Sequence, residues 1–213
     1  LADDAVPDEV AALFGCAVLT GMGAVLRSGA ARDSDHVVVY GLGAVGLAAV
    51  MAARIAGAAT IVAVDPNPDK HAAALASGAT HVATPDQVPD LVAELTGGEG
   101  ADLVIEAVGA VPVLEAGLAI AGRGGAVVAV GLPHPDTVLT TAALPFAGAG
   151  KRLIGSYMGD AVPSEDIPRY AAWWREGRLP LEVLHTDTVP LADINEALDA
   201  LAQGRVIRRL FRA

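Results

Sequence analysis

Short apolar runs alternate with longer Ala- and Leu-rich stretches from about His36 onward. Runs of three to six residues rich in β-branched side chains are typical of buried parallel strands, and the stretches between them have the length of helices. This alternation predicts βαβ units and therefore a parallel sheet. The strands that we expect cover residues 37–40, 60–64, 81–83, 103–107, 126–130 and 153–156.

Helix signals fall between these strands. Residues 44–56 carry one charge, Arg54, and end at Gly57, which predicts a helix buried nearly all round. Asn67, Pro68 and Gly78 suit an N-cap, a first helical position and a helix stop, so we expect a helix over 68–77. Further crossovers at 90–96 and 113–121 complete a doubly wound α/β sheet of five or six strands, a Rossmann fold.

Two segments lie outside this central domain, which we place at residues 31–157. Residues 8–28, within an N-terminal segment 1–30, read as one helix or two abutting helices broken around 15–23. The tail, residues 158–213, predicts an amphipathic stretch at 167–176, a strand near 188–189, a helix at 192–202 and a strand at 206–211.

The charge balance narrows the class of partner. Fourteen Lys and Arg against 25 Asp and Glu give a net charge of −11, which disfavours nucleic acid and anionic membranes. A single cysteine, Cys16, excludes an internal disulfide, and with no export signal the chain suits the cytoplasm. We expect a soluble protein, because polar residues, Gly or Pro interrupt each apolar stretch before about 18 residues.

The strongest chemical signal is a glycine turn. Gly41, Gly43 and Gly46 have the spacing G-x-G-x-x-G directly after one predicted strand and before one predicted helix. Such glycines allow a tight turn, close approach of the backbone to a diphosphate, and close helix–strand packing. With Ala44 and Val45 at the start of the helix, they predict a dinucleotide diphosphate site at its positive end.

An acidic residue supports this interpretation. Asp65 lies 24 residues after Gly41, at the end of the second predicted strand, where its carboxylate can bind an adenosine ribose and repel a 2′-phosphate. No Arg follows at 66–68, so we expect NAD rather than NADP. Two alternatives stay open: a purely structural turn with Asp65 as a helix cap, and an S-adenosylmethionine methyltransferase, which uses a similar turn and acid.

Separated motifs across essentially the whole chain resemble the zinc-containing medium-chain alcohol dehydrogenases. They occupy residues 15–21, 37–46, 64–70, 105–109, 130–131, 153–156 and 193–197. Within the family, the chain is most similar to the glutathione- or mycothiol-linked formaldehyde dehydrogenase branch and its bacterial relatives. The resemblance implies hydride transfer between a small alcohol or aldehyde and NAD, with zinc in the complete enzyme.

The resemblance also implies roles for single side chains. Cys16 matches the third protein ligand of the catalytic zinc, and Thr20 matches a residue on the nicotinamide side, on the same helix face as Cys16. Lys70 matches a residue beside the ribose, and Arg208 matches an arginine that reaches the diphosphate. Without the motifs, Cys16 would be interpreted as a core residue and the two cations as surface charges.

Backbone contacts complete the expected site. Val108 and Gly109 belong to a motif at the cofactor, and Val130, Gly131 and Ser156 match positions whose backbone groups bond the nicotinamide carboxamide. For Glu106 we expect only a structural carboxylate that faces a helix. The histidines have no metal-ligand spacing and are expected to be structural or solvated.

The family's remaining zinc ligands, a Cys and a His, come from an N-terminal catalytic domain that this sequence lacks. We therefore expect residues 1–30 to be linking helices and 158–213 to be a tail that would return to that domain, with apolar side chains exposed. The chain alone should bind NAD without oxidising alcohol. Alternatives are a zinc-free quinone reductase, which would prefer NADPH, and a non-enzymatic NAD-binding module. We expect a homodimer formed through an edge strand, with residues 138–144 as a candidate.

Overall fold

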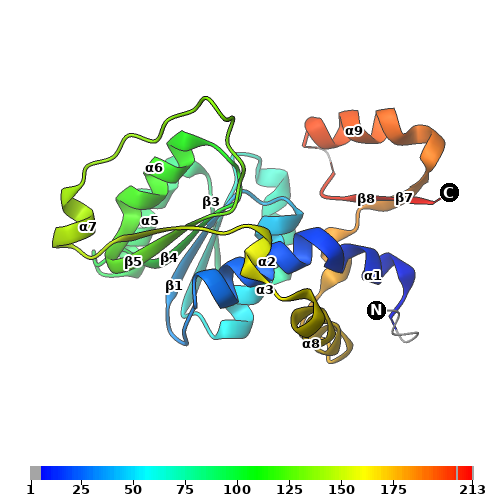
Figure 1. The fold of residues 1–213 in the computed structure, drawn as a ribbon, viewed down its shortest axis with the longest axis horizontal. Helices are drawn as coiled ribbons and strands as arrows, with labels where there is room; N and C mark the ends of the chain where they lie inside the picture. The colour runs from blue at the N-terminus through cyan, green and yellow to red at the C-terminus, as the bar shows by residue number, and fades with distance from the viewer. Residues whose placement is uncertain (1–5, 205, 213) are drawn as a thin grey trace.

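A six-stranded parallel sheet forms the centre of the molecule (Figure 1). The computed structural model describes residues 6–204 and 206–212. The sheet order is β3-β2-β1-β4-β5-β6, so the order reverses between β1 and β4, where open α/β sheets bind ligands. The predicted doubly wound fold is confirmed. The strands are β1 (His36–Tyr40), β2 (Thr60–Val64), β3 (His81–Ala83), β4 (Ala101–Glu106), β5 (Ala121–Ala129) and β6 (Arg152–Gly155).

Helices cover both faces of the sheet and divide the core in two. Successive residues of a strand point to opposite faces, so Val39 joins one core cluster and Val38 joins the other. The first cluster lies under α3 (Ala44–Ala56), α4 (His71–Ser77) and the N-terminal helix, and the second under α5 (Val88–Leu95) and α6 (Val111–Ile120). The predicted helix at 44–56 is confirmed at both ends.

Several element ends differ from the prediction for local reasons. The predicted helix 68–77 is a 3-10 turn, η3 (Pro68–Lys70), followed by α4, and Asn67 caps it by accepting from the nitrogen of Asp69. Helix α5 begins earlier than expected, because a second 3-10 turn, η4 (Pro85–Gln87), with a capping box precedes it. Strand β5 begins at Ala121, where a register irregularity extends its pairing with β4.

The N-terminal helix is continuous, so of the two expected alternatives the structure has one helix rather than two abutting helices. It runs through α1 (Asp8–Leu13), η1 (Phe14–Val18), α2 (Leu19–Gly23) and η2 (Ala24–Ser28), of which η1 and η2 are π-helical. Its glycines serve packing instead: a Cβ on Gly21 would lie 2.2 Å from the oxygen of Val45 on α3. Gly21 therefore lets the two helices approach closely.

Glycines interrupt this apolar stretch as expected, Gly15 among them, but they do not end the helix. Asp8–Ser28 has 21 residues and contains an 18-residue window with a mean hydropathy of 1.8, so it is long and apolar enough to cross a bilayer. However, 61% of that window is buried inside the fold, which is typical of a core helix. Leu13, Val18 and Met22 belong to the first of the two core clusters.

The chain after β6 divides into two parts. The first part contains η5 (Met158–Asp160), α8 (Pro163–Arg175) and η6 (Leu181–Leu184). The second contains β7 (Asp187–Pro190), η7 (Leu191–Asp193), α9 (Ile194–Ala202) and β8 (Arg209–Arg212), with β7 and β8 paired in a separate parallel sheet beside α1 (Figure 1). The predicted elements of the tail are present, although the last strand begins at Arg209 rather than at 206.

The two parts of the tail differ in burial. Tyr170, Leu181 and Leu184 are fully buried in the first core cluster. The expectation that the tail exposes its apolar side chains is therefore wrong for α8 and η6. These segments pack against the N-terminal helix and α4 instead. The later part agrees with the expectation, since it leaves Leu191, Ile194, Leu198, Leu201 and Phe211 exposed.

The candidate dimer segment, residues 138–144, carries no strand. It is irregular up to Leu144, where the short helix α7 (Leu144–Gly148) begins, and Val138 is 77% exposed. The free edge of the sheet at this end is β6. The dimer stays a prediction.

Candidate functional site

The glycine turn has the geometry that a diphosphate site requires. Gly41 has φ +91°, a left-handed conformation that favours glycine. A Cβ on Gly46 would lie 1.7 Å from the oxygen of Gly41, so the third glycine permits the helix to start directly under the turn. Gly43 is different, because a Cβ there would meet nothing within 4 Å. It is the N-cap of α3 and leaves open space at the helix N-terminus.

Asp65 connects the end of β2 to this turn. Its Oδ2 accepts from the backbone nitrogen of Leu42 at 2.9 Å and from Nζ of Lys70 at 3.0 Å, and its Oδ1 accepts from the nitrogen of Asn67 at 2.9 Å. Asp65 is 5% exposed. Asp65 and Lys70 thus lie together beside the glycine turn, and the helix cap is Asn67. A role of either side chain at a ribose stays a prediction.

Glu106 has a role that the sequence did not reveal. This carboxylate is 2% exposed, and its Oε1 accepts from the backbone nitrogens of Val108 at 2.8 Å and Gly109 at 2.7 Å. It therefore holds the turn after β4, and it faces its own turn rather than a helix as expected. The side chain of Val108 lies close to the glycine turn, since a Cβ on Gly41 would lie 2.8 Å from it.

The backbone nitrogens expected at the carboxamide already have partners. Val130 and Gly131 both donate to the oxygen of Glu106, at 2.9 and 3.0 Å, and Ser156 donates to the oxygen of Ala129 at 3.0 Å. A further ligand at these three positions would therefore meet carbonyl oxygens, which accept hydrogen bonds. The group predicted to bond here is therefore the NH₂ of the nicotinamide carboxamide, which can donate to these oxygens.

A cavity of about 400 Å³ lies over the glycine turn. Its floor is Gly43, Ala44, Val45 and Gly46 with Ala107 and Ala17, and its other wall comes from α9, β8 and residues 206–208 between them. Leu198, Leu201 and Arg208 belong to that wall. Part of the exposed apolar surface of the tail thus borders this cavity, so a ligand bound there would cover it.

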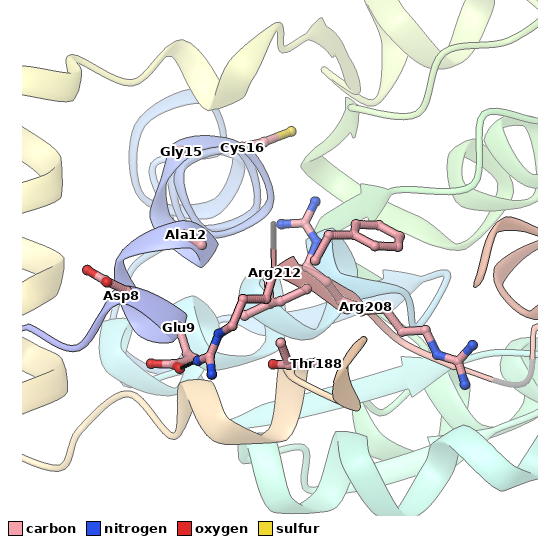
Figure 2. Close-up of a pocket in the computed structure, with 11 residues that line it drawn as sticks. Asp8, Glu9, Ala12, Gly15, Cys16, Thr188, Arg208 and Arg212 are labelled. Atoms are coloured by element: carbon pink, nitrogen blue, oxygen red, sulfur yellow. Dashed lines mark hydrogen bonds and ion pairs between the residues drawn. The ribbon is translucent and has the colours of Figure 1, made fainter. Parts of the chain in front are cut away.

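A second, larger cavity of about 780 Å³ lies between α1 and β8. Figure 2 shows Cys16 on the helix at one side, with Arg208 and Arg212 on the facing chain. Arg212 pairs with Glu9 at 2.9 Å, and Arg209 pairs with Asp187 at 2.9 Å. Within the described part of the chain, Arg208 has no such ion pair and borders both cavities, so its guanidinium can receive an anion from either side.

Cys16 and Thr20, four residues apart on the N-terminal helix, differ in burial. Cys16 is exposed, whereas Thr20 is 8% exposed and its hydroxyl contacts Sδ of Met158 at 3.7 Å. The difference arises at Thr20, because η5 packs against α2 there and covers this side chain. The roles implied for both residues stay predictions.

A zinc site is incomplete among the residues that the structure describes. Zinc in a catalytic site needs three protein ligands. Over residues 6–204 and 206–212, no group of three His, Cys, Asp or Glu side chains is arranged to hold a metal. Cys16 is thus at most one ligand of a set, and these residues do not fit a resident zinc by themselves.

Tyr40 marks the end of β1 next to the turn. Burial raises its pKa to about 12, so its hydroxyl stays protonated across the neutral range. Its neighbours at the carboxyl edge of the sheet are drawn together by backbone bonds: Ala107 donates to the oxygen of Tyr40, and Gly41 donates to the oxygen of Val64. Three strand ends thus converge on one site.

A family comparison agrees with this geometry. The model of the family described as zinc-binding dehydrogenase matches residues 44–176, which include α3, the Asp65 region and the turn after β4. The chain belongs to the zinc-binding dehydrogenase family. This confirms the resemblance to zinc-type alcohol dehydrogenases, while the formaldehyde dehydrogenase branch stays a prediction.

Individual relatives of this family member match nearly all of its length. An NDMA-dependent alcohol dehydrogenase of Amycolatopsis methanolica is 37% identical over 97% of the chain, and alcohol dehydrogenase 2 of Zea mays is 34% identical over 97%. The solved benzyl alcohol dehydrogenase of Acinetobacter calcoaceticus superposes with a TM-score of 0.93 at 29% identity over 99% of the chain. The chain spans 57%, 55% and 58% of these three proteins, respectively.

Proposed function

We propose that this chain is the NAD-binding part of a zinc-type alcohol dehydrogenase. In this reaction the alcohol carbon gives a hydride to the nicotinamide and its hydroxyl gives up a proton, which leaves an aldehyde or ketone and NADH. The observation that carries the proposal is the open space at Gly43, bordered by the turn that Asp65 holds. NAD, when bound, supplies the carbon that accepts the hydride.

The adenosine end of the cofactor is held by the chain's own residues in this proposal. The open helix end at Gly43 and Ala44 receives the diphosphate, because its backbone N–H groups and the helix dipole attract an anion. Among the described residues, Oδ1 of Asp65 has a single protein donor, so it can accept from a ribose hydroxyl. Its negative charge disfavours a 2′-phosphate, which supports NAD over NADP.

The tail contributes a cation and an apolar wall. Arg208 borders the cavity above the turn without an ion pair in the described chain, and we assign it to the diphosphate. Leu198 and Leu201 border the same cavity and would exclude water from the bound dinucleotide. The nicotinamide end would lie near Val130 and Ser156, and the side chain of Thr20 would face the nicotinamide.

In this proposal, zinc is bound only in the complete enzyme. The described residues supply Cys16 and no complete ligand set, so no step of the reaction is assigned to the metal here. We infer that this chain alone binds the cofactor but does not turn over alcohol.

Partners follow from the same proposal. The substrate is a small alcohol or aldehyde, and a net charge of −11 argues against nucleic acid and anionic membrane as partners. We also propose that the protein forms a homodimer through the cofactor domain. A cytoplasmic location, where Cys16 stays a thiol, is proposed as well.

The second candidate is a non-enzymatic NAD-binding module. The absence of a three-ligand metal cluster within the described residues favours it over catalysis for the chain by itself. A zinc-free quinone reductase is less consistent with Asp65 beside the ribose position, because such enzymes prefer NADPH.

Titration with NADH and NADPH, beside an alcohol oxidation assay, tests these functions. We expect saturable NADH binding, NADPH binding weaker by about tenfold or more from charge repulsion at Asp65, and no turnover with added zinc. Turnover by the 213-residue chain would contradict the inferred inactivity. Preference for NADPH would favour the quinone reductase, and no binding of either would contradict every NAD-based function.

A further inference from the structure

A hydrogen-bonded chain joins the end of β6 to the N-terminal helix. The hydroxyls of Ser156 and Ser28 are 2.7 Å apart, and Oγ of Ser28 donates to Oδ2 of Asp160 at 2.6 Å. Ser28 has one hydroxyl proton, and an ionised carboxylate can only accept. The proton of Ser28 is therefore used on Asp160, so Ser156 donates to Ser28. The chain runs from Ser156, which is 7% exposed, to the exposed Asp160.

Asp160 lies in a turn of unusual backbone conformation. Met158, Gly159 and Asp160 have φ of +52°, +71° and +49°, so two residues with side chains adopt the left-handed region. This conformation is unfavourable for a residue with a side chain, so the surroundings must hold it. The bond from Ser28 to Asp160 is one such restraint.

The same turn presses on the helix that carries Thr20. A Cβ on Gly23 would lie 2.3 Å from the oxygen of Gly159, so the two backbones are in contact. Met158 in the turn receives the hydroxyl of Thr20 at 3.7 Å. Figure 1 shows this segment against α2. One small turn therefore fixes Thr20 and Ser156 relative to each other.

We propose that Ser28 and Asp160 are positioning residues for the nicotinamide half of the cofactor. This inference rests on the proposed function, in which Thr20 and Ser156 border the nicotinamide. Ser28 does not contact the cofactor in this account; it acts through Ser156 and through the turn at 158–160. The adenosine half is held at Gly43 and Asp65, which follow β1 and β2, and is independent of the clamp formed by Ser28, Ser156 and Asp160.

The test compares two ligands on one variant. NADH reports both halves of the site, and ADP-ribose reports the adenosine and diphosphate half alone. For Ser28→Ala we expect the Kd of NADH to rise about tenfold while that of ADP-ribose changes less than about twofold. The fluorescence of bound NADH, which reports the nicotinamide environment, should shift toward that of free NADH. Ser164→Ala, an exposed serine on α8, is the matched control and should match the wild type.

A second pair of variants separates positioning from loss of fold. Asp160→Asn keeps an acceptor oxygen and tolerates the left-handed conformation, so it should bind NADH as the wild type does. Asp160→Ala removes the acceptor and should reproduce the selective loss of Ser28→Ala. If Ser28→Ala does not fold, this pair decides by the same NADH to ADP-ribose comparison.

Two results would overturn the inference. One is unchanged NADH affinity in a folded Ser28→Ala chain, and the other is an equal loss of NADH and ADP-ribose, which indicates general loosening. Failure of the wild-type chain to bind either ligand would overturn the proposed function and this inference with it. Wild-type binding of both ligands without a selective loss in the variants would overturn the inference alone.

Discussion

The carboxylate of Asp65 accepts a hydrogen bond at 2.9 Å from the backbone nitrogen of Leu42, which lies inside the glycine turn. The two residues are 23 positions apart in sequence. The acid that would select the cofactor is thus also a support of the loop that would bind its diphosphate, so structure and binding are coupled at this residue.

Asp65→Ala should therefore affect both stability and affinity. It leaves the buried nitrogen of Leu42 without its acceptor, and we expect the free energy of unfolding to fall by about 1–3 kcal/mol, measured by urea denaturation. NADH affinity should fall as well, and the preference for NADH over NADPH should shrink, because the repelling charge is gone. Asp69→Asn, at an exposed position nearby, is the control and should leave both properties unchanged. Wild-type stability in Asp65→Ala would argue against the coupling.

Glu106 should matter for stability through the turn after β4. Glu106→Ala leaves the nitrogens of Val108 and Gly109 unpaired, and we expect a loss of about 2–3 kcal/mol in the free energy of unfolding. Glu106→Gln keeps one acceptor oxygen and should cost less. Urea denaturation beside Glu115→Gln, on the exposed face of α6, measures the difference. Equal stabilities of Glu106→Ala and Glu106→Gln would show that the two hydrogen bonds do not support the turn.

Asp166 should make stability depend on pH. Burial alone would raise the pKa of this fully buried carboxyl, but hydrogen bonds from Arg27 and the nitrogen of Val162, with the charges of Arg27 and Arg169, hold the pKa below its ordinary value. A lowered folded pKa means that the stabilisation is complete above the ordinary value of about 4 and is lost as pH falls through the folded value.

Urea denaturation between pH 6 and pH 3 tests this. The wild type should lose stability toward pH 3, while Asp166→Asn should be less stable at pH 6 and lose less on acidification. Glu165→Gln removes the other carboxylate that pairs with Arg27. Because the side chain of Glu165 is 69% exposed and screened by solvent, this variant should keep the wild-type dependence of stability on pH. Parallel pH profiles for Asp166→Asn and the wild type would refute the assignment to Asp166.

Local signals made much of the fold predictable. Both ends of the helix Ala44–Ala56 can be predicted from the sequence, because the glycine turn precedes its start and Gly57 ends it in a left-handed conformation. Asn67 and Pro68 likewise marked a helix start that the structure retains as a 3-10 turn. The N-terminal helix was harder, since Gly21 and Gly23 look like breakers until their packing partners, Val45 and Gly159, are known.

The site was predictable where chemistry is encoded by short spacing. Gly41, Gly43 and Asp65 were found because strand, turn, helix and acid follow in order. Glu106 was missed because its partners are nitrogens of its own turn, which a sequence does not display. The link from Ser28 to Ser156 spans 128 residues and depends on tertiary structure alone.

The affinity of Gly43→Ala for NADH tests the central claim most directly. A Cβ at this position meets no protein atom within 4 Å and φ is −82°, so the fold should tolerate alanine while the methyl group occupies the approach to the diphosphate. Gly148→Ala, on the exposed short helix α7, is the matched control. By calorimetric titration we predict that NADH binding weakens about tenfold or more in Gly43→Ala, with an unchanged melting temperature. Wild-type NADH affinity in Gly43→Ala would contradict the account.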